Sequence, residues 1–277
     1  MNPRESNEPI MPVVPEGAPQ EKTLGGASAN LESILLEVKR IKDEVEKGVS
    51  PTTEELSTLE VGVEETLKLV IEEERNARFD ALTGLPNLRM FNEIMLIEMS
   101  RLERQRREGY NYPLYAVKID LDHFKNINDN FGHEAGNLYL QFVSKHMRAA
   151  VRDTDTLARV GGDEFVILMP ELDSGNVEQV KERLLGAVLK GSAEAKAELM
   201  SQRPGLAVQD GDGNISASMG FELFDGHETS NEFLEHADYY SYVAKAAGKN
   251  AVVSREMAAE LDPKGDILKR FTASKKD

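Results

Sequence analysis

Apolar residues recur every three or four positions in two stretches of the N-terminal part of the chain. The first stretch begins at Asn30, and the second follows a break at residues 48–51. Apolar residues with this spacing line one face of an α-helix, and Thr52 or Thr53 can cap the second helix. The sequence therefore predicts two amphipathic helices within residues 29–79.

The segments at the two ends of the chain differ from the rest in composition. Residues 1–28 are rich in Pro, Gly and Glu and contain few large apolar residues. Such a segment cannot bury enough apolar surface to offset the entropy lost on ordering. We therefore expect residues 1–28 to be a disordered tail, and the polar residues 255–277 to form a loose C-terminal tail.

Helical and strand patterns intermix between residues 80 and 254. Runs of β-branched and aromatic residues indicate strands, and the three-to-four residue spacing indicates helices. We expect strands at residues 113–121, in a hairpin around the pair Gly161 and Gly162, at 215–224 and at 251–253. We expect helices from about residue 88 to 108, briefly after 123, and over about 134–151, 175–190 and 231–247. The absence of strict strand–helix alternation favours an α+β fold with a mainly antiparallel central sheet flanked by helices.

Composition limits the classes of function. A net charge of −16 over 277 residues argues against a nucleic-acid surface, which needs a basic footprint. The absence of cysteine excludes disulfides and thiolate metal sites. No apolar run approaches the roughly 20 residues that span a bilayer, and the N-terminus lacks the apolar core of a signal peptide. We expect a cytoplasmic protein with no membrane segment and no nucleic-acid partner.

Carboxylates stand at the ends of two predicted strands. A pair of glycines precedes Asp163 and Glu164, and glycines let a backbone turn tightly and approach a phosphate closely. Asp120 stands at the end of the first predicted strand. Because carboxylates at such turns hold hard divalent cations, we expect Asp120 and Asp163 to pair across the sheet as a metal site. The neighbouring Asp122 is predicted to cap the helix that follows it.

Five blocks of sequence occur in a characteristic order: residues 80–87 (DALTGLPN), 120–125 (DLDHFK), 126–136 (NINDNFGHEAG), 159–165 (RVGGDEF) and 244–251 (AKAAGKNA). In order and spacing these blocks resemble the GGDEF family, the diguanylate cyclases. The glycine pair alone is a weak signal, since many hairpins carry one, and its weight comes from the other blocks. The resemblance covers residues 80–254, and helical segments such as residues 29–79 often precede domains of this family.

The resemblance implies a fold related to the nucleotide cyclases, with one GTP and two Mg²⁺ ions per active site and Mn²⁺ as an alternative metal. It implies a homodimer in which each 3′-hydroxyl attacks the α-phosphorus of the other nucleotide, giving cyclic di-GMP and pyrophosphate. By position, Asp120, Asp163 and Glu164 are catalytic, and the metal ligands are Asp120, Asp163 and the Leu121 carbonyl. The implied substrate-binding residues are His123, Phe124, Lys125, Asn128, Asn137, Lys245 and Lys249.

Arg152 and Asp155 stand shortly before the glycine pair. Taken alone, an arginine three residues before an aspartate is more often a surface ion pair. Here the two match the RxxD inhibitory site of the family, and Arg183 matches a secondary arginine of that site. The resemblance therefore implies that cyclic di-GMP binds there and inhibits the enzyme, since a guanidinium suits phosphates and guanine edges.

Two positions depart from the family pattern. Lys249 stands where the family commonly has arginine, so a point charge replaces a planar fork. Asn137 stands where the family has an aspartate that accepts hydrogen bonds from guanine, and asparagine offers one acceptor and one donor group instead. Three outcomes stay open: weaker selectivity for GTP, use of ATP as well to make cyclic GMP-AMP, or a decayed nucleotide site with a surviving cyclic di-GMP receptor. We expect cyclic di-GMP as the main product.

The role of residues 29–79 also stays open. Two helices of this size form little core by themselves. They are either a hairpin that merely packs on the rest of the chain, or a stalk that dimerises and regulates. A third interpretation is a scaffold that recruits a protein partner through residues 1–79.

Overall fold

The computed structural model describes residues 25–110, 112–204 and 213–275. The chain divides into two compact units, Met1–Arg75 and Asn76–Asp277. The tail expected over residues 1–28 lies outside the described residues up to residue 24, and the first helix begins at Gly25.

Two helices form the first unit, as the apolar spacing predicts. They are α1 (Gly25–Glu46) and α2 (Thr53–Arg78), which continues into the second unit. Arg40 of α1 pairs with Glu55 of α2 at 2.7 Å. Large apolar side chains nevertheless remain exposed on both helices: Leu31, Leu35, Leu36, Val38, Val45, Leu56, Val61, Val63, Leu67, Val70 and Ile71. No described helix of the chain is long and apolar enough to cross a bilayer.

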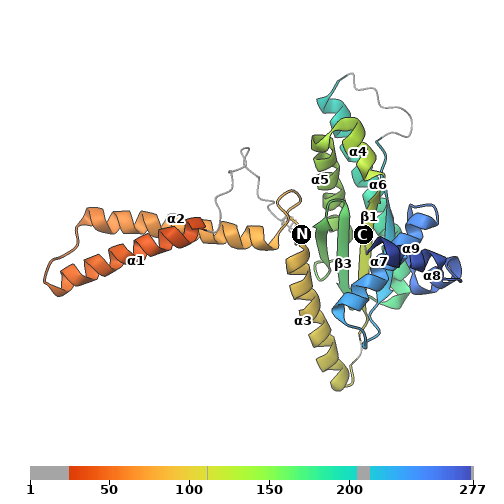
Figure 1. Cartoon of the computed structure of the whole chain (residues 1–277), viewed down its shortest axis with the longest axis horizontal. Helices are drawn as coiled ribbons and strands as arrows, with labels where there is room; N and C mark the ends of the chain where they lie inside the picture. Colours follow the sequence, from red (N-terminus) through yellow and green to blue (C-terminus); the bar gives the residue numbers. More distant parts are fainter. Residues whose placement is uncertain (1–24, 111, 205–212, 276–277) are drawn as a thin grey trace, which may run out of the picture. The chain divides into compact units, whose positions relative to one another are not determined.

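A five-stranded sheet in the order β2-β3-β1-β4-β5 forms the centre of the second unit (Figure 1). The strands are β1 (Leu114–Asp122), β2 (Thr156–Gly161), β3 (Glu164–Pro170), β4 (Ser216–Leu223) and β5 (Ala251–Ser254). All neighbouring strands are antiparallel except β4 and β5, which are parallel. The flanking helices are α3 (Leu88–Arg107), α4 (Phe124–Phe131), α5 (His133–Ala150), α6 (Val177–Gln202), which follows a 3₁₀ turn at Ser174–Asn176, and α7 (Ser230–Ala246). The predicted α+β fold is confirmed.

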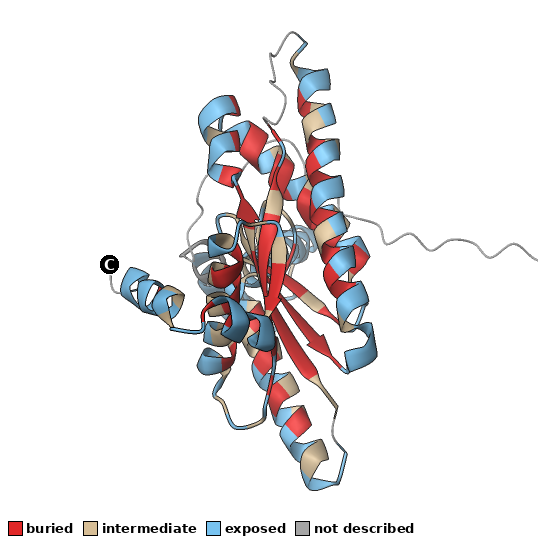
Figure 2. Ribbon diagram, turned by 90° about the vertical axis from the view of Figure 1, so that its right-hand side faces the viewer, coloured by how far each residue is buried: buried red, intermediate tan, exposed pale blue. Residues whose placement is uncertain are grey.

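Side chains of the central strand β1 alternate between two hydrophobic cores, because successive residues of a strand point to opposite faces. Val117 and Ile119 belong to a core shared with α4, α5 and α6. Leu114 and Ala116 belong to a second core shared with α3 and α7. Figure 2 shows the strands buried along most of their length. The charged residues of β1 all lie in its second half, beginning at Lys118 and followed by Asp120 and Asp122.

Helix α6 is longer than the sequence predicts. It continues to Gln202, whereas the pattern indicated an end near Lys190. Gly191 does not break the helix. A Cβ at this position would lie 2.7 Å from the Cα of Val143, so the missing side chain lets α6 pack directly on the backbone of α5.

The loose tail expected over residues 255–277 is wrong for the described part of that segment. Two helices, α8 (Arg255–Leu261) and α9 (Asp266–Ser274), occupy it. The ring of Phe271 lies 5.6 Å from the rings of Tyr239 and Tyr242 on α7. Ile267, Leu268 and Phe271 do stand at helical spacing, but the apolar stripe is confined to a helix of nine residues between polar ones, which is why the sequence pattern missed it.

Gly220 of β4 marks a close approach between the sheet and α7. A Cβ at this position would lie 1.8 Å from the carbonyl oxygen of Ala237. We predict that Gly220→Ala lowers the free energy of unfolding by about 1–3 kcal/mol, because the helix must move away from the sheet. Urea denaturation of the full chain measures this change.

The matched control is Gly186→Ala in the exposed face of α6, where nothing lies within 4 Å of the new methyl group. This change should leave the free energy of unfolding unaltered or raise it by up to about 1 kcal/mol, because alanine favours a helix over glycine. Equal effects of the two substitutions would contradict the proposed backbone packing.

Candidate active site

Strands β1 and β3 bring the predicted carboxylates together. Asp120 stands directly opposite Glu164 in the antiparallel register. The Leu121 amide donates to the carbonyl oxygen of Asp163 at 3.2 Å. The cross-strand partner of Asp120 is therefore Glu164 and not Asp163, because the hairpin turn places Asp163 one residue beyond the ladder. That Asp120 and Asp163 together hold a metal stays a prediction. Residues directly opposite one another have Cβ atoms about 5 Å apart, so two acidic side chains face each other here.

Two lysines compensate this charge. Lys245, in the last turn of α7, places its Nζ 2.6 Å from Oδ2 of Asp120. Lys118 of β1 places its Nζ 2.6 Å from Oε2 of Glu164. Burial raises the pKa of Asp120, as do the charges of Asp163 and Glu164, and Lys245 only partly opposes this effect. The site is therefore short of positive charge in the absence of a cation.

The donor set suits a hard divalent cation. Carboxylate oxygens and a main-chain carbonyl are ligands that Mg²⁺ accepts, and the expected set of Asp120, Asp163 and Leu121 offers both kinds. Within the described part of the chain, the carboxylates of Asp120, Asp163 and Glu164 do not gather within 4.8 Å of one another. Two of them are held by lysines, so a cation must compete with an ammonium group.

Asp122 is buried and fastens β1 to its neighbours. Its carboxylate accepts hydrogen bonds from the hydroxyls of Ser216 and Ser218, both at 2.7 Å, and from the amide of Asn250 at 3.0 Å. The prediction that Asp122 caps α4 is therefore wrong. The helix follows His123, which has a φ of 63° and makes no side-chain cap.

The expected phosphate-binding residues occupy two places in the fold: the start of α4, with His123, Phe124 and Lys125, and the segment from the end of α7, with Lys245 and Lys249. The first N–H groups of a helix have no partner within the helix and favour anions. Lys249 has a left-handed backbone, with φ of 69°. The hydrogen bond from Asn250 to Asp122 joins this second place to the carboxylate strand.

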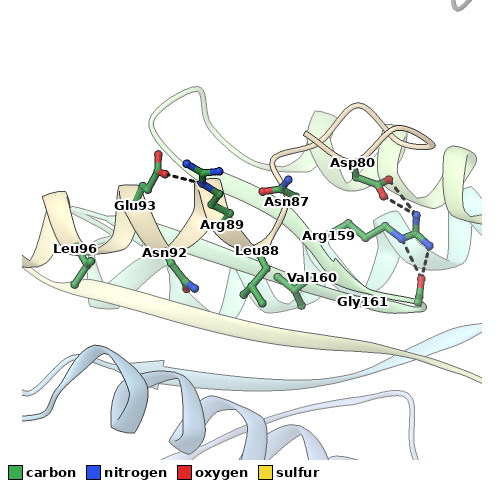
Figure 3. A pocket seen from close by; sticks show the side chains of 11 residues that line it. Asp80, Asn87, Leu88, Arg89, Asn92, Glu93, Leu96, Arg159, Val160 and Gly161 are labelled. Carbon is green, nitrogen blue, oxygen red and sulfur yellow. Dashed lines mark hydrogen bonds and ion pairs between the residues drawn. The ribbon is translucent and has the colours of Figure 1, made fainter. Parts of the chain in front are cut away.

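A cavity of about 880 Å³ lies beside the glycine turn, between α3 and β2 (Figure 3). On its wall, Arg159 donates to both carboxylate oxygens of Asp80 at 3.0 Å and to the carbonyl of Gly162 at 2.7 and 3.0 Å. Burial alone would raise the pKa of Asp80, but hydrogen bonds from Thr83 and Arg159 hold it below its usual value. None of the three candidate catalytic carboxylates lines this cavity. Arg159 therefore acts on the site by fixing the glycine turn, a role that the sequence did not reveal.

The arrangement of carboxylates, glycine turn and lysines on this sheet agrees with the comparison to known protein families. A family model described as "Diguanylate cyclase, GGDEF domain" matches residues 77–251. The chain belongs to the GGDEF family.

Individual relatives support this assignment. DgcP of Pseudomonas aeruginosa, named a diguanylate cyclase, is 30% identical over 230 residues, which are 83% of this chain and 32% of DgcP. NbdA of the same species, named a cyclic di-GMP phosphodiesterase, is 33% identical over 175 residues, which are 63% of this chain and 20% of NbdA. The chain thus spans a third or less of the length of these relatives. A crystal structure of P. aeruginosa diguanylate cyclase SiaD with its activator SiaC matches over 83% of this chain and 80% of the solved SiaD chain, with a TM-score of 0.52 and 26% identity.

In this GGDEF domain, the two asparagines predicted to meet the base come from α4 and α5. Asn128 lies against Gly136, where a Cβ would stand 2.0 Å from its Oδ1 and 3.2 Å from the Phe124 ring. Glycine therefore leaves room for the amide of Asn128. Asn137 is the next residue of α5 and is exposed. The roles of both asparagines toward a base stay predictions.

The three residues predicted for the inhibitory site gather near the end of α5. The side chain of Asp155 is only 1% exposed, and it accepts from the Arg152 amide at 2.8 Å and from its guanidinium at 2.7 Å. The same guanidinium donates to the carbonyl of Pro170 at 2.9 Å. Arg183 donates from Nε to the carbonyl of Ala150 at 2.6 Å. Arg152 thus has a structural role whether or not a ligand binds.

Proposed function

We propose that this protein is a cytoplasmic diguanylate cyclase that condenses two GTP molecules into cyclic di-GMP with release of two pyrophosphates. The observation that carries the proposal is the opposed pair Asp120 and Glu164, with Asp163 beside it, on a GGDEF fold. DgcP, whose name records this activity, supports the proposal over the third of its length that the chain spans.

The proposed metals are Mg²⁺, two in each active site, with Mn²⁺ as an alternative. Asp120, Asp163 and the Leu121 carbonyl would hold them, and Glu164 is the further catalytic carboxylate. Bound divalent ions neutralise charge on a transferring phosphoryl group and on the oxygens that enter and leave. The pKa of Asp120, raised by burial and by its acidic neighbours, supports a need for such charge at this point.

The proposed contacts to the triphosphate come from both sides of the carboxylates. Backbone N–H groups of His123 and Phe124 open α4 and favour an anion. Lys125 and Lys249 add positive charge. Lys245, which binds Asp120 in this structure, would bind phosphate when a metal takes its place on the carboxylate.

Each domain supplies one nucleotide site, but the product joins two nucleotides. We therefore propose that catalysis requires a homodimer in which two sites face each other. Positioning of the two nucleotides then supplies much of the rate, because it makes the attack effectively intramolecular.

Asn137 decides the choice of base in this proposal. Full-length protein incubated with GTP, ATP or an equal mixture in Mg²⁺ should give cyclic di-GMP as its main product, identified by mass spectrometry. Asn137→Asp should raise the preference for GTP over ATP by roughly 5- to 150-fold, because each hydrogen bond restored to a bound guanine, which covers the side chain, is worth about 1–3 kcal/mol. Cyclic GMP-AMP from the mixture would instead identify a hybrid cyclase.

The controls for this experiment are Asp163→Asn and Glu164→Gln, which should abolish turnover and leave the circular dichroism spectrum unchanged. The enzyme proposal fails if no nucleotide mixture gives a cyclic dinucleotide. Calorimetric binding of cyclic di-GMP without Mg²⁺-dependent turnover would identify a receptor that acts through Arg152, Asp155 and Arg183.

Feedback inhibition by cyclic di-GMP at Arg152, Asp155 and Arg183 is the second part of the proposal. Arg183 is the better probe, because Arg152 also covers the buried carboxylate of Asp155. Arg183→Ala should raise the cyclic di-GMP concentration that halves the initial rate by about tenfold, which corresponds to the loss of one charged hydrogen bond.

Initial rates with added cyclic di-GMP, together with calorimetry, measure this effect. Arg152→Lys, which retains the charge and loses the planar fork, should weaken inhibition in the same direction. Lys190→Ala removes a positive charge from the exposed face of the same helix as Arg183 and should change nothing. Unaltered inhibition in the Arg183 variant would contradict this assignment.

For the first unit we propose that α1 and α2 bury their exposed apolar side chains against a second copy of the chain. Leu67 on α2 is 57% exposed, and Lys68 beside it has a side chain that is 76% exposed. Leu67→Glu should shift the mass measured by light scattering from dimer to monomer and lower activity at low protein concentration. Lys68→Glu is the matched control and should remain a dimer.

A wild-type chain that is monomeric at micromolar concentration would contradict this role for the helices. Activation of such a monomer by an added protein would favour recruitment of a partner through residues 1–79. The structure of SiaD in complex with its activator SiaC supports that alternative.

A further inference from the structure

Lys118 is a charged residue in the middle of the sheet that none of the recognised blocks contains. Its side chain is only 13% exposed. The pattern of β1 explains how it reaches the site. Asp120 is opposite Glu164, and Lys118 is opposite Val166, so Lys118 and Glu164 are diagonal neighbours on one face of the sheet.

The Lys118 ammonium has two acidic neighbours. One is Glu164, with Nζ to Oε2 at 2.6 Å, and the other is Asp238 of α7, at 4.0 Å. Asp238 is itself paired with Lys275, just after α9, at 3.1 Å. The four groups alternate in sign from the end of the last helix to the candidate catalytic carboxylate. The closer acidic partner of Lys118 is thus Glu164, while the closer lysine to Asp238 is Lys275.

We propose that Lys118 is a positioning residue that holds Glu164 beside the metal site and thereby sets how tightly the site binds divalent cations. The inference rests on the proposed function, in which Asp120, Asp163 and the Leu121 carbonyl hold the cation and Glu164 is the neighbouring catalytic carboxylate. It goes further by making the affinity for metal depend on a lysine outside the recognised blocks.

Electrostatics gives the direction of the effect. A divalent cation held by Asp120 and Asp163, next to Glu164, is repelled by the Lys118 ammonium that is paired with Glu164. Two unit charges near a protein surface interact strongly, because the effective dielectric constant there is only about 20, so removal of this positive charge should strengthen divalent-ion binding by at least about tenfold. Loss of the Lys118 ammonium also frees Glu164 from its fixed position. The turnover rate at saturating metal should therefore fall, and the metal concentration that gives half-saturation should fall as well.

The test titrates the full-length protein with Mn²⁺ alone and counts free Mn²⁺ by electron paramagnetic resonance, so it needs no turnover. Lys118→Met retains the length and apolar stem of the side chain and should bind Mn²⁺ about tenfold more tightly than wild type. Lys118→Arg retains the charge and should bind within about threefold of wild type. Asp163→Asn identifies which binding belongs to the site.

Lys181→Met is the matched control. Lys181 is also a buried lysine with an acidic partner, Glu178 at 2.7 Å, but it stands on α6 and contacts the ring of Phe221. Its substitution should not change Mn²⁺ affinity.

Two outcomes separate this inference from the proposed function. If wild type binds Mn²⁺ at the site and folded Lys118→Met binds it equally or more weakly, the role of Lys118 is overturned and the cyclase proposal stands. If Asp163→Asn removes no Mn²⁺ binding, the cation site is wrong and both proposals fall.

Discussion

The electrostatic repulsion between Asp120 and Glu164 is the constraint that the surrounding residues of the domain must compensate. The two carboxylates face each other across adjacent strands, and like charges in that position destabilise a sheet. The fold tolerates them because Lys245 and Lys118 each place an ammonium 2.6 Å from one of them. The site therefore combines three carboxylates, Asp163 included, with two ammonium groups, and any ion that enters must rearrange these contacts.

The surrounding structure keeps this balance in a fixed geometry. Arg159 joins Asp80 to the glycine turn from which Asp163 and Glu164 extend. Asp122 holds the end of β1 to β4 and to the loop after α7. Buried hydrogen bonds to a carboxylate are among the stronger polar interactions in proteins. The hydrogen bonds of Asp122 hold the strand that carries Asp120, while the Asp120 side chain can still exchange Lys245 for another partner.

Much of this could be predicted from the sequence, because apolar periodicity and glycine-rich turns are local signals. These local signals predict the order of strands and helices, and they also predict that Asp120 lies close to the glycine turn. The pairing of Lys118 with Glu164 joins residues 46 positions apart, and no local pattern distinguishes it from an ordinary exposed lysine. The bonds of Asp122 depend on the register of β1 against β4. The continuation of α6 past residue 190 depends on the contact of Gly191 with the backbone of α5, which is also a long-range property.

The almost complete burial of Asp155 has a consequence for how this domain can change over time. Its carboxylate depends on Arg152 for charge compensation, so loss of that arginine leaves an uncompensated charge in the interior. A variant that escapes the proposed product control by this route must also survive a loss of folding stability. Arg183, whose guanidinium donates to the carbonyl of Ala150, offers a less constrained route. If the proposed inhibition operates, variation in its strength among descendants of this protein should accumulate at Arg183 before it reaches the arginine that covers Asp155.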